Sequence, residues 1–179
     1  MKRFVLTGAP GAGKTSIINA LAAMGHDVVP EAATYIIAQE AAKGIAEPWL
    51  YPGFIDKIIA LQARRQEESA GQDDDIQFFD RSPVCTFALA EYLGFPPSPA
   101  LMNEMDRIEA EQIFVRRALF IENLGFVEKT AARQINFEDS LVFERIHRET
   151  YERFGYDCFS IPAAPLAERV KLALTAVTP

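Results

Sequence analysis

The chain has 179 residues, of which 49% are hydrophobic and 24% are charged. This is the composition of an ordinary globular domain with a sizeable core, and we expect one domain over residues 1–179. The formal net charge is −7. The chain therefore lacks the overall basic character of a nucleic-acid binder, and no nucleic-acid partner is expected.

Cysteine and histidine spacing argues against a zinc site. Cys85 and Cys158 lack paired spacing, and both are expected to be buried, reduced thiols. His26 and His147 stand alone in the sequence, and surface positions are expected for both. No apolar run approaches the roughly 18 residues of a membrane span, and no signal peptide is evident. We therefore expect a cytoplasmic protein with no membrane partner.

Short apolar segments alternate with longer helical patterns along the chain. Strands are expected at residues 4–7, 27–30, 76–79, 118–122 and 158–161. Helices are expected at residues 14–24, 32–43, 53–70, 83–94, 99–114, 137–154 and 165–177, with Ser82 and Asn136 as caps. This alternation predicts an α/β fold of three layers, in which a mainly parallel sheet carries helices on both faces. Ligands of such folds bind at the carboxyl ends of the strands, where Gly8, Glu31 and Asp80 fall.

The first strand leads into a phosphate-binding motif. Residues 8–15 read GAPGAGKT and fit G-x-x-x-x-G-K-[ST] in full. Glycines let the backbone approach phosphate oxygens, while successive amides and the following helix terminus hold the anion. Lys14 supplies a positive charge for the β- and γ-phosphates, and Thr15 supplies a hydroxyl for Mg²⁺. The expected nucleotide contacts are Gly8, Pro10, Gly11, Ala12, Gly13, Lys14, Thr15 and Ser16.

A chance match is the alternative interpretation of this motif. The segment follows an apolar strand and opens an amphipathic helix, which is the context of a true phosphate loop. The sequence has no guanine-reading Asn/Thr-Lys-x-Asp motif. We therefore expect ATP with Mg²⁺.

Two strand ends deliver acids to the same edge of the sheet. Asp80 and Arg81 follow the third strand, where Asp80 is expected to hold Mg²⁺ through water and Arg81 to orient a substrate oxygen. Alternatively, Asp80 and Ser82 are caps of the next helix and Arg81 is solvated. Glu31 ends the second strand and is a candidate to accept the proton of an attacking hydroxyl or to help place the metal. The alternative is an acid that stabilises the next helix dipole.

A lid is expected near residues 124–136, which lack a clean apolar period and precede a well-capped helix. Arg133, and less strongly Lys129, is expected to close over the nucleotide and neutralise the transferring phosphoryl group. A solvated basic loop is the other interpretation. Trp49 and Tyr51 either wall an acceptor pocket or pack locally.

Taken together, the phosphate loop, Glu31, Asp80-Arg81-Ser82 and Arg133 resemble the phosphate-loop nucleoside and nucleotide kinases. More narrowly, the chain resembles the small AAA-type ATPase domains related to the ribosylnicotinamide kinase domain, over nearly its whole length. The resemblance implies the P-loop NTPase fold with a five-stranded sheet in the order 2-3-1-4-5. It also implies that Asp80 assists Mg²⁺, Arg81 positions the acceptor and Glu31 is the general base. With one arginine and one lysine, the lid departs from the several arginines of many such kinases.

The leading hypothesis is an ATP-binding kinase that phosphorylates a nucleoside-, nucleotide- or vitamin-like hydroxyl acceptor, as a monomer or homodimer. The alternative is a phosphate-loop ATPase that acts as a nucleotide-dependent switch on a protein partner. A second pocket bounded by Glu31, Arg81 and residues 49–54 would favour the kinase. A flat apolar outer patch would favour the switch.

Overall fold

The computed structural model describes residues 1–70, 75–126 and 135–178. Within them, one parallel sheet runs in the order β2-β3-β1-β4-β5. Its strands are β1 (Lys2–Thr7), β2 (Asp27–Val29), β3 (Ile76–Asp80), β4 (Arg117–Ile121) and β5 (Asp157–Ile161). The implied sheet order is thereby confirmed.

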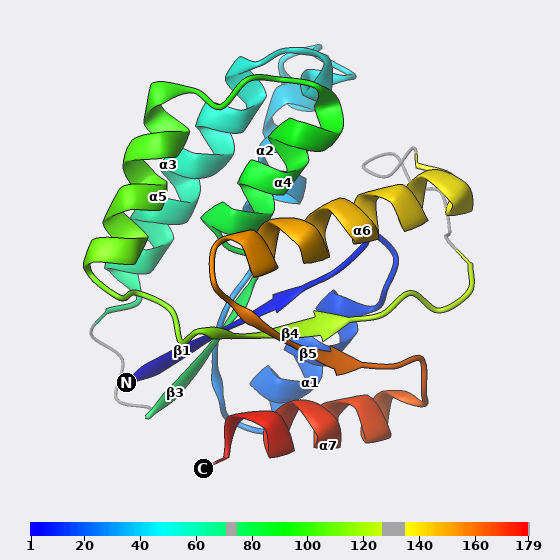
Figure 1. The fold of residues 1–179 in the computed structure, drawn as a ribbon. Coiled ribbons are helices and arrows are strands. Elements are labelled where there is room, and N and C mark those ends of the chain that lie inside the picture. Colours follow the sequence, from blue (N-terminus) through cyan, green and yellow to red (C-terminus); the bar gives the residue numbers. More distant parts are fainter. Residues whose placement is uncertain (71–74, 127–134, 179) are drawn as a thin grey trace.

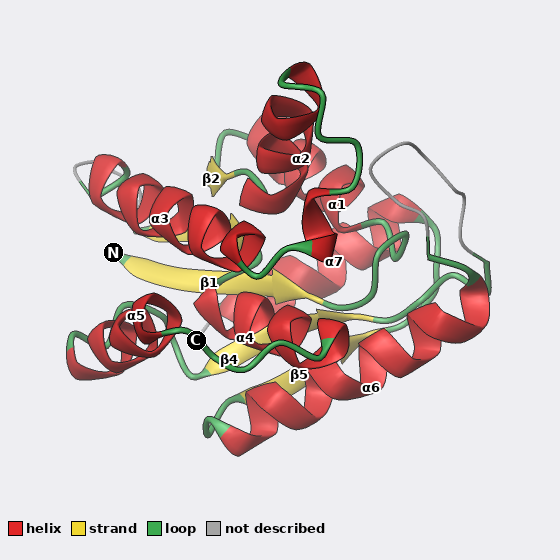
Figure 2. Ribbon diagram, turned by 90° about the horizontal axis from the view of Figure 1, so that it is seen from above, coloured by secondary structure: helices red, strands yellow, loops and turns green. Residues whose placement is uncertain are grey.

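Helices cover both faces of the sheet (Figure 1). On one face lie α1 (Lys14–Ala23) and α7 (Leu166–Val177), and on the other lie α3 (Gly53–Glu68), α4 (Pro83–Leu93), α5 (Pro99–Ala110) and α6 (Phe137–Arg153). The helix α2 (Ala32–Ala42) and the 3₁₀ turn η1 (Pro48–Leu50) pack against α3. In Figures 1 and 2, α4 runs close to α6, and the two helices are in contact. The predicted three-layer α/β fold is confirmed.

The register brings the expected functional strand ends together. Leu6 of β1 pairs with Asp80 of β3, and Thr7 pairs with Phe120 of β4. The central strands are buried on both faces, because parallel strands carry helices on either side. The segments that follow β1 and β3 therefore leave the sheet side by side at its carboxyl edge.

Most helix ends lie within two residues of prediction, but α5 ends at Ala110, four residues before the predicted 114. Gln112 adopts a left-handed φ of 50°, and the Ile113 amide donates to the Ile108 carbonyl at 3.0 Å. This geometry closes the helix and reverses the chain. Ile113 and Phe114 follow this turn and continue the apolar period of the helix, which is why the sequence predicts a helix that is too long.

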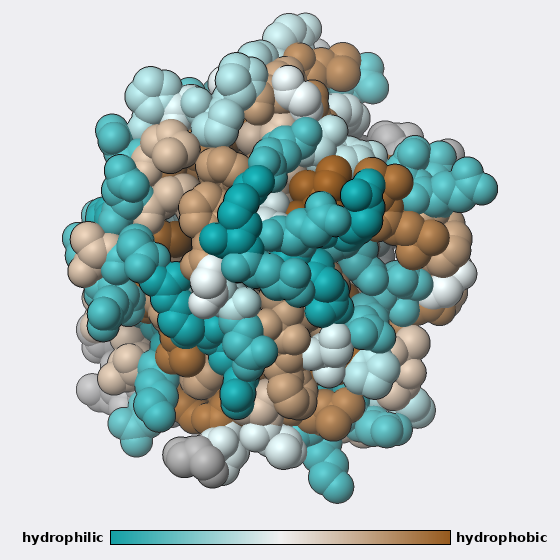
Figure 3. All heavy atoms as spheres, in the orientation of Figure 1, coloured by the Kyte–Doolittle hydropathy of each residue, from teal (hydrophilic) through white to brown (hydrophobic). Residues whose placement is uncertain are grey.

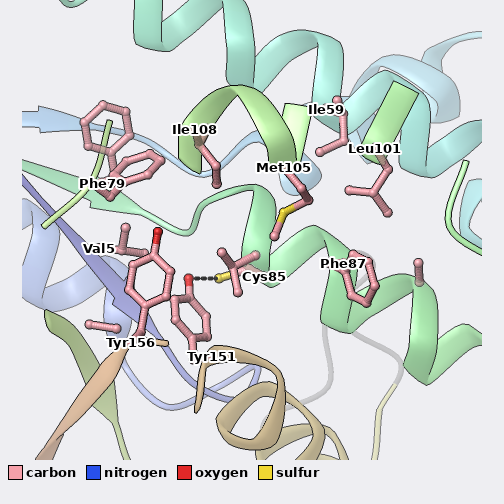
Figure 4. Close-up of a cluster of buried hydrophobic side chains, with 14 of the residues drawn as sticks. Val5, Ile59, Phe79, Cys85, Phe87, Leu101, Met105, Ile108, Tyr151 and Tyr156 are labelled. Atoms are coloured by element: carbon pink, nitrogen blue, oxygen red, sulfur yellow. Dashed lines mark hydrogen bonds between the residues drawn. The ribbon is translucent and has the colours of Figure 1, made fainter. Parts of the chain in front are cut away.

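Two apolar cores lie above and below the sheet. Figure 4 shows the one beneath α3–α6, where Tyr151 points its hydroxyl at the buried Cys85 thiol, at an Oη–Sγ distance of 3.0 Å. Cys85 is buried as expected, whereas Cys158 is only partly buried. Ser82 is the N-cap residue of α4 as predicted, but its side chain makes no capping hydrogen bond. Its hydroxyl instead contacts Tyr151 Oη at 2.7 Å, because a buried phenol needs a polar partner.

The outer face of α6 is mainly hydrophilic in Figure 3, and apolar side chains gather towards its N-terminal end. There the predicted cap is confirmed, since the Asp139 amide donates to Asn136 Oδ1 at 2.8 Å. Among the described residues, no helix is both long enough and apolar enough to span a membrane.

Candidate functional site

The phosphate loop (residues 8–15) joins β1 to α1 through left-handed backbone. Gly8, Gly11 and Gly13 have φ of 123°, 83° and 82°. A Cβ on Gly8 would lie 2.2 Å from the Ile121 carbonyl oxygen, so this position excludes any side chain. Gly13 is the N-cap of α1, and the first backbone amides of a helix lack intrahelical partners, so the loop and this helix end together can bind an anion.

Lys14 crosses the inside of this loop. Its side chain is buried, and Nζ donates to the carbonyl oxygens of Gly8 at 3.1 Å and Ala9 at 2.7 Å. Burial, reinforced by Arg81, lowers the pKa of Lys14 to about 7, against the opposing pull of Asp80 and Glu31. An incoming anion would restore the full charge of this amine.

Thr15 and Asp80 meet at the carboxyl edge of the sheet. Thr15 Oγ1 donates to Asp80 Oδ2 at 3.3 Å, and Asp80 Oδ1 is buried with no hydrogen-bond partner among the described residues. Burial and the charge of Glu31 raise the pKa of Asp80, opposed by Lys14 and Arg81. A hydroxyl beside a carboxylate with an unused oxygen matches the hard oxygen ligands that Mg²⁺ prefers. These residues therefore fit the ion.

No group of three or more His, Cys, Asp or Glu side chains able to hold a metal occurs in the described ranges. An ion at Thr15 and Asp80 would therefore take its remaining ligands from water and phosphate oxygens, as Mg²⁺ commonly does.

Glu31 and Arg81 form an ion pair beside the phosphate loop. Arg81 Nε donates to Glu31 Oε1 at 2.6 Å, and Thr34 Oγ1 donates to Glu31 Oε2 at 2.6 Å. Burial pushes the pKa of Glu31 upwards, but Arg81, Lys14 and Thr34 outweigh it and hold the pKa below its ordinary value. Arg81 has a φ of 73°, and its amide donates to the Leu6 carbonyl at 3.0 Å. The left-handed backbone thus turns the Arg81 side chain towards the end of β2, so it is not the solvated arginine of the alternative interpretation.

A pocket of ≈ 720 Å³ extends from the phosphate loop past Glu31 and Arg81. Its other part, which we call the apolar compartment, is walled by apolar and aromatic side chains from α2, η1, α3, α4 and α6. They are Ile37, Trp49, Phe54, Ile58, Leu89, Leu93, Tyr92 and Phe143. Neutral polar groups are present as well, with Thr86 Oγ1 donating to Gln62 Oε1 at 2.9 Å. Trp49 thus lines the pocket, whereas Tyr51 is 62% exposed and is not among its described lining residues.

His147 corrects a prediction. It was expected at the surface, yet it is fully buried and stacks on Phe143 with ring centroids 4.0 Å apart. Its Nδ1 bonds the Phe143 carbonyl at 2.9 Å. Burial, assisted by Arg81, holds the pKa of His147 well below its usual range. The ring is therefore a neutral part of the pocket wall, which no local spacing in the sequence indicated.

The structure brings most of the predicted site residues together. The phosphate loop, Glu31 and Arg81 share one pocket, and Asp80 meets Thr15 just behind it. Arg133, Lys129 and most of the expected lid lie outside the described residues. Sequence reasoning missed Gln62, Thr86 and Phe143, which stand on helices among residues of ordinary core type.

Comparisons with known proteins agree with this architecture. A family described as AAA domain matches residues 3–169. A solved structure of deoxyadenosine kinase from M. mycoides with bound dATP is similar to the chain with a TM-score of 0.62, at 12% identity, over 99% of this chain and 99% of that one.

Two further structures of the M. mycoides enzyme give the same result. The structure with the products dCMP and a flexible dCDP has a TM-score of 0.60 at 12% identity, over 98% of both chains. The structure with bound dCTP has a TM-score of 0.60 at 13% identity, over 99% of this chain and 98% of that one. At such identities the similarity concerns the fold. No curated protein sequence matches the chain.

Proposed function

The chain belongs to the AAA domain family, and from this premise we propose that it is a kinase. It would transfer the γ-phosphoryl group of Mg-ATP to a hydroxyl of a nucleoside-, nucleotide- or vitamin-like molecule. The observation that carries the proposal is the ≈ 720 Å³ pocket, which the phosphate loop and the apolar compartment share. In this proposal the apolar compartment is the acceptor pocket. A nucleotide-driven switch has no need of a second compartment beside its phosphates.

The donor half of the proposal rests on the phosphate loop. The amides of residues 11–15 bind the phosphates, and Lys14 moves from its two loop carbonyls to the β- and γ-phosphate oxygens. Thr15 and Asp80 would hold Mg²⁺, which would supply positive charge to the phosphates. The remaining work of the site is positioning and charge stabilisation, because phosphoryl transfer requires little covalent chemistry from the protein.

The acceptor half rests on Glu31 and Arg81. The acceptor hydroxyl oxygen forms a bond to the γ-phosphorus, the bond from that phosphorus to the β,γ-bridging oxygen breaks, and ADP leaves. Glu31 accepts the hydroxyl proton, since it lines the pocket and its lowered pKa keeps it ionised, whereas Asp80 faces Thr15. Arg81 fixes the Glu31 carboxylate and lends positive charge beside the transferring group.

The decisive measurement is ATP consumption against a panel of nucleosides, nucleotides and vitamin-like alcohols, with mass spectrometry of the products. The kinase proposal requires a panel member that stimulates ADP formation and gains a phosphoryl group in equal amount. Steady hydrolysis that no acceptor changes would instead support the ATPase or switch. Lys14→Ala should abolish nucleotide binding or turnover in either case.

Glu31 is the N-cap of α2, and Glu40 of the same helix provides a matched control. Glu31→Gln should lower kcat by about 10²–10⁴-fold while leaving ATP affinity close to wild type. Glu40, a buried carboxylate, pairs with Lys43 and Lys57 and is not among the described residues that line the pocket. Glu40→Gln should leave kcat near wild type. Equal kcat values for the two variants would remove Glu31 from the mechanism.

A further inference from the structure

A buried arginine stands behind the phosphate loop. Arg169 lies near the N-terminal end of α7 and is 3% exposed. In Figure 1, α7 lies beside α1, the helix that the phosphate loop opens, and both pack on the same face of the sheet. The side chain of Arg169 is not among the described residues that line the pocket.

The Arg169 guanidinium connects the phosphate loop to the end of β4. Its Nη2 donates to the Glu122 carbonyl oxygen at 3.1 Å. Its Nη1 lies 2.9 Å from the position that a Cβ on Gly13 would occupy. The guanidinium therefore packs directly on the backbone of the last loop glycine, and any side chain at Gly13 would displace it.

Among the described residues, the Arg169 guanidinium forms no ion pair. No carboxylate of the described residues lies within ion-pair distance of Arg169, and its Nε has no hydrogen-bond partner among them. Burial lowers the pKa of Arg169, with a smaller opposing effect from Glu122, but a guanidinium keeps its charge at neutral pH. A buried, unpaired charge is unfavourable, and an apolar side chain would serve better as a mere spacer.

An anion brought to the neighbouring loop would compensate this charge. The amides that follow Gly13 form the expected phosphate site, and Gly13, which Arg169 touches, lines the pocket, whereas Arg169 is not among its described lining residues. In a poorly solvated region, such a charge acts on an anion without direct contact.

We propose that Arg169 is a positioning residue for the donor nucleotide. It supports the Gly13 backbone from behind, so that the loop amides are preorganised, and its unpaired positive charge strengthens phosphate binding. The inference rests on the proposed nucleotide site and extends that site to a helix more than 150 residues further along the chain. It does not depend on the identity of the acceptor.

Equilibrium binding of Mg-ATP to the full chain, measured by calorimetry, tests this role. Arg169→Met, which removes the charge and the fork of donors, should raise the ATP Kd about tenfold or more, and Arg169→Lys should have a smaller effect. Arg117→Met is the matched control, because Arg117 Nη1 donates to the Ala176 carbonyl at the opposite end of α7. The control should leave the Kd within about twofold of wild type.

The kinetics distinguish this role from a purely structural one. In turnover assays, the KM for ATP should rise while the KM for the acceptor stays unchanged. A folded Arg169→Met variant with wild-type ATP Kd would overturn the proposal.

If circular dichroism shows that Arg169→Met does not fold, the ATP Kd of Arg169→Lys tests the proposal instead. A wild-type Kd for the lysine variant overturns the proposal, and a Kd raised about threefold or more supports it. The kinase proposal is refuted by a different result. A wild type that binds ATP but phosphorylates no panel member would refute the kinase activity and leave the role of Arg169 standing.

Discussion

Binding of ATP should draw a proton from solution at pH 8, because Lys14 is largely neutral in the nucleotide-free protein. Its pKa of about 7 means that only about a tenth of the molecules carry the charge at pH 8. A bound triphosphate restores the charge. We therefore expect an uptake of about 0.9 proton per ATP at pH 8 and about 0.1 at pH 6. The apparent affinity at pH 8 should be about tenfold below that of the fully charged form, or about 1.4 kcal/mol.

The assay is calorimetric titration with Mg-ATP in buffers of different ionisation enthalpy, whose slope gives the protons taken up. Asp80→Asn should retain the uptake at pH 8, which separates Lys14 from the nearby carboxyl group. A slope near zero at pH 8 in the wild type would refute the reasoning, because it would mean that Lys14 is already charged.

The same shift has a consequence for stability. Lys14 has its ordinary pKa of 10.5 in the unfolded chain, which therefore binds more protons than the folded chain between about pH 7 and 10.5. The contribution of Lys14 to the free energy of unfolding thus rises with pH across that window. Denaturant titrations of the nucleotide-free wild type and of Lys14→Met at pH 7 and pH 9 should show this gain in the wild type alone.

Three further variants test the site and its support. Gly8→Ala should destabilise the protein by about 3 kcal/mol or more in denaturant titration, because the Cβ meets the Ile121 carbonyl at 2.2 Å. Gly25→Ala, also at positive φ but in open space, should cost only about 1 kcal/mol, and similar losses for both would contradict the contact. Asp80→Asn should raise the Mg²⁺ concentration for half-maximal turnover about tenfold, and an unchanged Mg²⁺ titration would remove Asp80 from the metal site. Tyr151→Phe should cost about 1–3 kcal/mol in thermal unfolding, since it leaves a buried hydroxyl unpaired, and an unchanged Tm would argue against that bond.

The sequence by itself determined the features that depend on neighbouring residues. The glycines of residues 8–15 predict a left-handed loop between a strand and a helix, and the structure has that loop with Lys14 folded across it. Alternating strands and helices predict the parallel sheet, because crossover helices must cover both of its faces. Asn136 predicts the start of α6, since a cap acts within one turn.

Only the tertiary structure decided which side chains from distant segments of the chain are in contact. Ser82 was expected to act locally, yet its hydroxyl bonds Tyr151, 69 residues away. His147 has no distinctive spacing in the sequence, and its burial follows from the packing of α6 against α4. Arg169 reaches Gly13 only because α7 returns beside α1.

The physical reason is the range of the forces involved. Caps, glycine conformations and hydrophobic periods act over a few residues, so the sequence displays them directly. Burial, ion pairing and pocket shape depend on which helices the sheet order brings together, and these contacts span the whole chain. The phosphate loop can therefore be recognised from eight consecutive residues, whereas the apolar compartment and the contact between Arg169 and Gly13 exist only in the folded chain.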